Sequence, residues 1–185
     1  MAIKTFTSGA ILTASDTNTF LANSGLVYVT SVAVGSGVTT QNVPNAFNAN
    51  FDNYRIVISN VDCSIDGNGV KLKLDGITTA VYSSASVFST YSGAAPTGGG
   101  YVNDAGGIQV GITSITNDTH CIIDICSPFV ASRKTYTYQT SNANVCGSGG
   151  GYVNSSLSAT GFTIDPDGAT TMTGGFITVF GYRKA

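Results

Sequence analysis

The sequence predicts an all-β fold: a jelly-roll-like, two-sheet β-sandwich preceded by a short N-terminal arm with one helix. All ten acidic residues are aspartates, which favour turns and caps, whereas the better helix former Glu does not occur. Glycine is abundant, at 23 of 185 residues. Short runs with a period of two, separated by turn-forming residues, fill most of the chain. These features favour about eight to ten short strands in two packed sheets.

The first 25 residues are predicted to form a docking arm. Thr13 is a suitable N-cap, and Asp16 occupies the third helical position of a capping box. Apolar side chains follow, and Gly25 provides a stop signal, which gives a helix of about three turns. Such a helix is marginal in water on its own, so we expect it to pack on the body or on a partner. The residues expected to make this docking contact are Ile11, Leu12, Phe20, Leu21 and Leu26.

Residues 26–185 are expected to form a single β-sandwich domain. The clearest alternation covers residues 70–74, where Leu72 and Leu74 would point inward while Lys71 and Lys73 point outward. Asp75-Gly76 then predicts a type I′ hairpin turn into a strand over 77–83. The other predicted strands cover 26–34, 54–61, 86–91, 108–115, 120–126, 135–140, 162–165 and 176–182. The last of these is apolar on both faces, which predicts a place inside a sheet or at a subunit interface.

The glycine runs 98–100 and 147–151 are predicted to be flexible loops. No Lys-Ser/Thr pair follows them, so they do not match a phosphate-binding loop. Tyr91, Tyr101 and Tyr152 are the candidate residues for binding a surface ligand such as a sugar, because their rings are amphipathic. The alternative is ordinary packing of these rings within loops.

Charge is scarce and unevenly distributed. Charged residues make up 10% of the chain, against about 25% in an ordinary soluble domain. None occurs over residues 17–51, 76–103 or 135–164. These stretches either form a surface of hydroxyl and amide groups or are buried against neighbouring subunits, since interface cores are depleted of charge. The eight basic residues are scattered and the net charge is −2, so we expect no nucleic-acid partner.

No membrane partner is expected either. The N-terminus lacks the apolar region of a secretory signal. The longest apolar stretches fall far short of the roughly 18 residues that cross a bilayer.

No catalytic, cofactor or metal site is predicted. His120 is the only histidine, and the G-x-S-x-G element of a serine hydrolase does not occur. The closely spaced aspartates lie in turn-like stretches with glycine, which favours turns over paired catalytic carboxylates. Residues 62–69 resemble the first half of a calcium loop, but Lys73 replaces the ligating Glu, which excludes an EF-hand and leaves a looser calcium site open.

The four cysteines show no metal-ligand spacing. They are predicted to be reduced, buried thiols, and a disulfide between two of them stays open. The cysteines are Cys63, Cys121, Cys126 and Cys146.

Three segments resemble small virion structural proteins of tailed bacteriophages, many of them from marine and cyanobacterial phages. The first is the opening KTFTSGAILTASDTNTFLANSGLVY over residues 4–28. The second is FDNYRIVI over 51–58, and the third is GGFITVFGYR over 174–183. They lie at both ends and near the middle, so the resemblance extends along the chain.

The resemblance implies a non-enzymatic structural component of the virion, assembled in the host cytoplasm and without a cofactor. We expect a homotrimer that decorates the capsid as a cement or head-fibre protein and contacts the major capsid protein through the arm. The alternative is a tail-fibre or adsorption module that contacts tail proteins and binds host polysaccharide through the Gly/Tyr-rich loops. The capsid is preferred because the chain has no coiled coil or β-helical repeat of the kind a long fibre needs. A depolymerase is disfavoured by the single histidine and by the absence of Glu and Trp.

Overall fold

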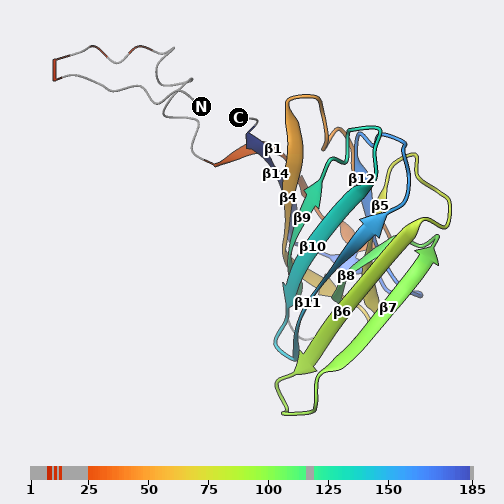
Figure 1. The fold of residues 1–185 in the computed structure, drawn as a ribbon. Coiled ribbons are helices and arrows are strands. Elements are labelled where there is room, and N and C mark those ends of the chain that lie inside the picture. Colours follow the sequence, from red (N-terminus) through yellow and green to blue (C-terminus); the bar gives the residue numbers. More distant parts are fainter. Residues whose placement is uncertain (1–7, 10, 12, 14–24, 116–118, 184–185) are drawn as a thin grey trace.

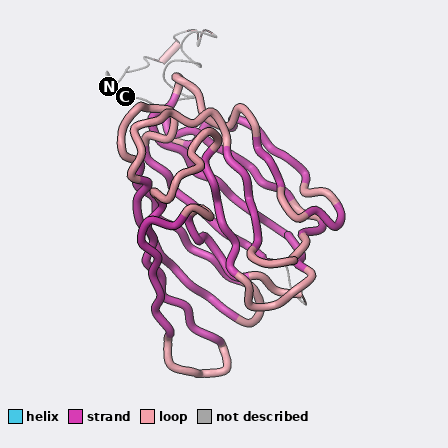
Figure 2. Tube along the Cα trace, turned by 90° about the vertical axis from the view of Figure 1, so that its right-hand side faces the viewer, coloured by secondary structure: helices cyan, strands magenta, loops and turns pink. Residues whose placement is uncertain are grey.

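The computed structural model describes residues 8–9, 11, 13, 25–115 and 119–183. Within them the secondary structure consists of strands and loops, as the colouring of Figure 2 shows. The strands are β1 (Leu26–Ala33), β2 (Ser36–Val38), β3 (Gln41–Val43), β4 (Phe51–Cys63), β5 (Gly69–Leu74), β6 (Tyr82–Thr90), β7 (Thr97–Asp104), β8 (Ile108–Ile112), β9 (Thr119–Cys126), β10 (Lys134–Ser141), β11 (Val145–Val153), β12 (Phe162–Pro166), β13 (Met172–Thr173) and β14 (Phe176–Arg183). The predicted helix of the arm lies outside the described residues.

The described strands form two antiparallel sheets, as a β-sandwich requires. The large sheet has the order β1-β14-β4-β9-β10-β11-β6-β7, with β13 and β2 attached beside β4. The small sheet has the order β3-β12-β5-β8. In Figure 1 the strands of the large sheet lie side by side in front of the small sheet, and the hairpin of β6 and β7 projects at the lower edge. The prediction of an all-β sandwich is confirmed.

The core lies between the two sheets and follows the predicted alternation. In β5, Leu72 and Leu74 are buried while Lys71 and Lys73 are only partly so. In β4, buried side chains likewise alternate with accessible ones, beginning at Tyr54 and Ile56. A strand covered on one face buries every second side chain, so these patterns define the inner face of each sheet.

The glycine runs belong to strands, and the prediction that they are loops is wrong. Gly147, Gly149 and Gly151 lie in β11, on the same face as the aromatic residues of the neighbouring strands. Tyr138 pairs with Gly149, and a Cβ at Gly149 would come within 2.6 Å of the Tyr138 ring. The glycines therefore make room for aromatic rings that cross β11, which packs the sheet rather than loosening it. The run at 98–100 likewise forms part of the edge strand β7.

The turn after β5 also differs from the prediction. Asp75-Gly76 does form a tight turn, with the Ile77 amide donating to the Leu74 carbonyl at 3.2 Å and Gly76 at φ 76°. The next strand is β6, however, and it belongs to the other sheet, while β5 pairs with β12 and β8. The turn therefore redirects the chain across the sandwich and does not close a hairpin. Local sequence encodes the turn but not the strand that will pair.

Strand β14 lies between β1 and β4, inside the large sheet as its apolar sequence predicts. Its residues Ile177 and Val179 are fully buried, whereas Phe176 on the other face is 54% exposed. Strand β1 is the edge of the sheet and contains no charged residue or proline. The division of the chain into an arm (1–25) and a body (26–185) stays a prediction.

Candidate functional site

The face of the large sheet that points away from the core carries the features that can bind a ligand; we call it the outer face. Residues paired across antiparallel strands lie on the same face, so the register defines its rows. One row runs from Val87 through Ser148, Gln139 and Ile122 to Val57. The next row runs from Ala85 through Gly150, Thr137 and Asp124 to Arg55. Neither row carries a large side chain on β11.

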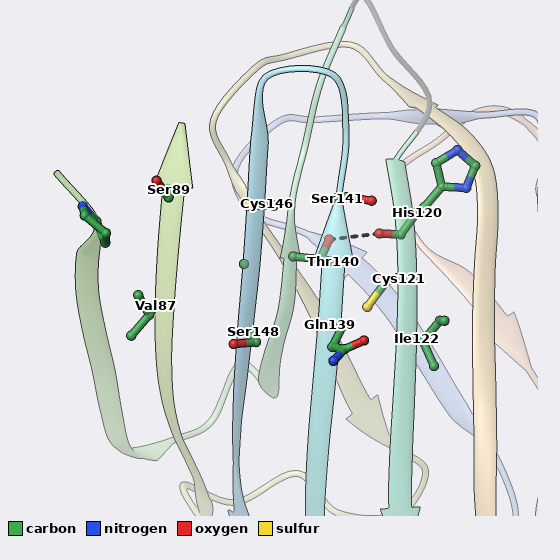
Figure 3. A pocket seen from close by; sticks show the side chains of 12 residues that line it. Val87, Ser89, His120, Cys121, Ile122, Gln139, Thr140, Ser141, Cys146 and Ser148 are labelled. Atoms are coloured by element: carbon green, nitrogen blue, oxygen red, sulfur yellow. Dashed lines mark hydrogen bonds between the residues drawn. The ribbon is translucent and has the colours of Figure 1, made fainter. Parts of the chain in front are cut away.

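In these two rows β11 presents only small side chains outward. The outer face is therefore hollowed over β10 and β11. Two depressions of about 520 and 490 Å³ adjoin there, with Ile122, Gln139 and Ser148 lining both. We call the combined depression the trough. Figure 3 shows its centre, with Val87, Ser148, Gln139 and Ile122 on four successive strands. Val87 is 53% and Ile122 42% exposed, so apolar side chains flank a polar floor.

Three polar side chains of the trough are free of internal partners. Among the described residues, the side chains of Thr137, Gln139 and Ser148 make no hydrogen bond with one another or with their surroundings. All three are exposed. Their amide and hydroxyl groups are therefore available to a ligand as both donors and acceptors.

The charges beside the trough belong to one compact cluster. Arg55 donates from Nε and Nη2 to the two carboxylate oxygens of Asp124, at 2.8 and 2.6 Å. The Tyr182 hydroxyl donates to Asp124 Oδ1 at 2.7 Å, and the Arg55 guanidinium lies 5.7 Å from the centre of the Tyr182 ring. The hydrogen bonds from Arg55 hold the pKa of Asp124 below its usual range, and the same contact raises the pKa of Arg55. Both groups stay charged at neutral pH and cancel each other.

The three candidate tyrosines do not converge on one site. Tyr101 lies on β7 opposite Ser84, and Tyr152 lies on β11 opposite Ser83. Ser83 and Ser84 are neighbours in β6 and point to opposite faces, so the two rings do as well. Each ring has a cation over it, Lys71 for Tyr101 and Arg133 for Tyr152. Tyr91 is exposed in the turn after β6.

The expected docking residues are described only in part. Ile11 and Leu26 are exposed, while Leu12, Phe20 and Leu21 lie outside the described residues. Leu26 belongs to a set of apolar side chains along β1 and β14 that we call the β1–β14 strip. Its residues are Leu26, Tyr28, Phe176 and Phe180. Tyr28 is 61% exposed and its ring meets that of Phe180 edge-on, with centres 6.3 Å apart. The two-sided apolar sequence of β14 was the signal for this strip.

The cysteines differ from the prediction in their burial. All four thiols are free, but Cys126 and Cys146 are exposed, and only Cys63 and Cys121 are buried. The expectation of four buried thiols is wrong because residues 126 and 146 fall on the outer face of their strands.

His120 is exposed at one end of the trough, where its carbonyl accepts a hydrogen bond from the Thr140 hydroxyl (Figure 3). Among the described residues, no group of three or more His, Cys or Asp side chains is placed to hold a metal ion. Asp66 of the calcium-like segment instead accepts a hydrogen bond from the Ile115 amide at 2.8 Å.

Comparison of the chain with models of protein families, with curated proteins and with solved structures finds no match.

Proposed function

We propose that the chain is a non-enzymatic structural protein of a tailed-phage virion, most simply a capsid decoration protein that docks through its N-terminal arm. The observation that carries the proposal is the β1–β14 strip, which lies at the strand that the arm enters. Leu26, Tyr28 and Phe176 expose apolar side chains there. These side chains form two groups, separated by the hydrogen-bonded hydroxyls of Ser31 and Thr178. Exposed apolar side chains gathered along one sheet edge mark a site of protein contact.

The edge of the sheet supports the same conclusion. In the described part of the chain, β1 pairs only with β14, so the backbone groups along its other side have no strand partner. Natural proteins usually protect such an edge with charges, proline or a very short strand, and the eight residues of β1 provide none of these. A neighbouring subunit or capsid segment would cover this edge in the assembled particle.

The order of the strands supports a viral scaffold. We infer that the sandwich is an expanded jelly roll built on β1, β3, β4, β5, β8, β9, β12 and β14. We number these eight strands 1 to 8 in chain order. Those in the large sheet then lie in the order 1-8-3-6, and those in the small sheet in the order 2-7-4-5. The hairpins β6–β7 and β10–β11 are then insertions that widen the large sheet. Jelly rolls occur in viral capsid and lectin domains, so by analogy of fold this order is compatible with a virion component.

Homotrimerisation is part of the proposal. A stable contact buries roughly 800 Å² on each partner, and we expect the β1–β14 strip to supply part of it. Many copies on one capsid would add weak contacts through avidity.

Cryo-electron microscopy of the intact phage particle tests the proposal. Density for this chain over the capsid lattice, with residues 1–25 against the shell, is the expected result. Density only at the tail would overturn capsid decoration and support the adsorption role. Absence of the chain from purified particles would overturn the virion role altogether.

The alternative role, adsorption to host polysaccharide, is favoured by the exposure of Tyr91, Tyr101 and Tyr152. It requires the three rings to act at separate contacts, because Tyr101 and Tyr152 lie on opposite faces of the large sheet. Retention of the chain on immobilised host polysaccharide, lost in Tyr101→Ala or Tyr152→Ala, would support it.

A further inference from the structure

We propose that the trough on the outer face of the large sheet binds a neutral oligosaccharide chain, lying across β9, β10 and β11. This inference does not depend on where in the virion the protein is located, and it uses none of the three candidate tyrosines. Each depression, at about 500 Å³, falls in the range of about 300–1,000 Å³ that is typical of ligand sites. They share Ile122, Gln139 and Ser148 in their lining, so a single chain can occupy both.

The lining matches the surface of a sugar. Gln139 and Ser148 are cross-strand partners at the centre, and both depressions include them. Their side chains have no hydrogen-bond partner among the described residues, so they can donate to and accept from vicinal hydroxyls. Val87 and Ile122 flank them with exposed apolar groups, which suit the C–H faces of a pyranose ring. Apolar walls with a few fixed polar groups are the usual composition of a small-molecule site.

The electrostatics select an uncharged ligand. Arg55 and Asp124 line the second depression, and they neutralise each other through two hydrogen bonds. Because the pair carries no net charge, it offers little attraction to an anionic or a cationic polymer. A hydroxyl group can instead bond to Arg55 Nη1, which lies outside the pair, without separating it.

The architecture explains why the trough is preformed. Gly149 and Gly151 hold the rings of Tyr138 and Tyr136 against the inner side of β11. The outward residues Ser148 and Gly150 of the same strand are small, which leaves the floor open. A rigid sheet that already has the shape of the site loses little conformational entropy on binding.

The test is a titration of the full-length protein, labelled with ¹⁵N, with neutral hexasaccharides followed by NMR. Cellohexaose, maltohexaose and mannohexaose are the probes, and hexagalacturonate is the anionic comparison. We expect at least one neutral probe to shift the amides of Val87, Ile122, Gln139 and Ser148, with hexagalacturonate causing no shifts there. Gln139→Ala should weaken that binding about five- to tenfold, as expected for the loss of one or two hydrogen bonds.

A matched pair of variants separates the trough from the rest of the face. Thr137 and Thr135 are both exposed on the outer face of β10, two residues apart, and only Thr137 lines the trough. Thr137→Ala should weaken binding and Thr135→Ala should leave it unchanged, with both variants keeping the dispersed spectrum of the wild-type protein.

Three results would overturn the proposal. The first is that none of the neutral probes shifts the trough amides at millimolar concentration. The second is that shifts appear only around Tyr91, Tyr101 or Tyr152, which would favour the adsorption alternative instead. The third is that the trough amides shift with protein concentration in the absence of sugar, which would assign the face to a second copy of the chain. If the chain is found in the virion but binds no sugar, this inference fails and the proposed function stands. If the chain binds sugar but is absent from the virion, the proposed function fails and this inference stands.

Discussion

Lys134 is a charged residue that the fold encloses completely, with 0% of its surface exposed. Its ammonium group donates hydrogen bonds to the carbonyls of Val130, Ser132, Ser155 and Leu157. Burial lowers the pKa of Lys134, but four carbonyl acceptors favour the charged form. The residue thereby joins the loop before β10 to the loop after β11.

Lys134→Met should therefore destabilise the protein by about 3–5 kcal/mol, because the carbonyls of Ser132, Ser155 and Leu157 lose their donor inside the protein, whereas that of Val130 keeps the Ser132 amide. Urea unfolding measures the difference. Lys73→Met is the control: Lys73 is half-exposed on β5, and its replacement should change the free energy of unfolding by less than about 0.5 kcal/mol. Equal effects of the two substitutions would contradict the role assigned to Lys134.

The Arg55–Asp124 pair predicts a defined pH dependence. Arg55 lowers the pKa of Asp124 in the folded state, so the unfolded chain binds a proton more readily than the folded one. The stabilising contribution is therefore complete above the unfolded pKa of about 3.9 and is lost as the pH falls through the folded value. The partial exposure of both side chains limits its size through solvent screening.

Asp124→Asn should remove this contribution. The difference in unfolding free energy between wild type and variant should be constant from pH 5 to 7 and should decrease as the pH falls below about 4. Urea unfolding at each pH provides the values. A difference that grows on acidification would mean that the folded state raises the pKa of Asp124, contrary to this prediction.

At the scale of single elements, the packing of strand β11 against its neighbours depends on its glycines. A Cβ at Gly151 would lie 2.0 Å from the Ser83 carbonyl oxygen of β6 and 2.8 Å from the Tyr136 hydroxyl. Because a carbonyl of a paired strand cannot move without breaking the ladder, Gly151→Ala should destabilise the protein by about 2–3 kcal/mol. Gly99→Ala in β7 is the matched control, since a Cβ there meets nothing within 4 Å. Thermal unfolding of both variants tests this, and a Gly151→Ala protein as stable as Gly99→Ala would refute it.

For the molecule as a whole, the β1–β14 strip predicts self-association. The full-length protein should have the mass of a trimer in light scattering after gel filtration, and Tyr28→Asp should shift it to a monomer, because a charge buried in an interface is strongly unfavourable. Val102→Asp, which changes an exposed residue of the opposite edge strand β7, should leave the trimer intact. A monomeric wild-type protein would contradict the trimer, and dissociation by Val102→Asp alone would place the contact on β7.

Local sequence patterns were sufficient to predict the class of fold and most of its strands. Alternation at Leu72 and Leu74, and the apolar run that forms β14, are local patterns, and burial of one face follows from them directly. The resemblance to phage virion proteins also came from sequence alone and stays a prediction. Local rules failed at Gly147–Gly151, where a loop-like composition forms a strand because the rings of neighbouring strands occupy the missing side-chain volume.

The pairing of the strands, and the residues that gather on the outer face, depend on contacts between distant parts of the chain. Asp75-Gly76 encodes a turn, but the partner of β5 is β12, about 90 residues further along the chain. Arg55, Asp124 and Tyr182 likewise come from three strands, as do Val87, Gln139 and Ser148 in the trough. Such sites depend on long-range register, because each strand contributes only one or two of their residues. The sequence therefore specifies the strands as units, whereas the trough exists only because the tertiary structure pairs them.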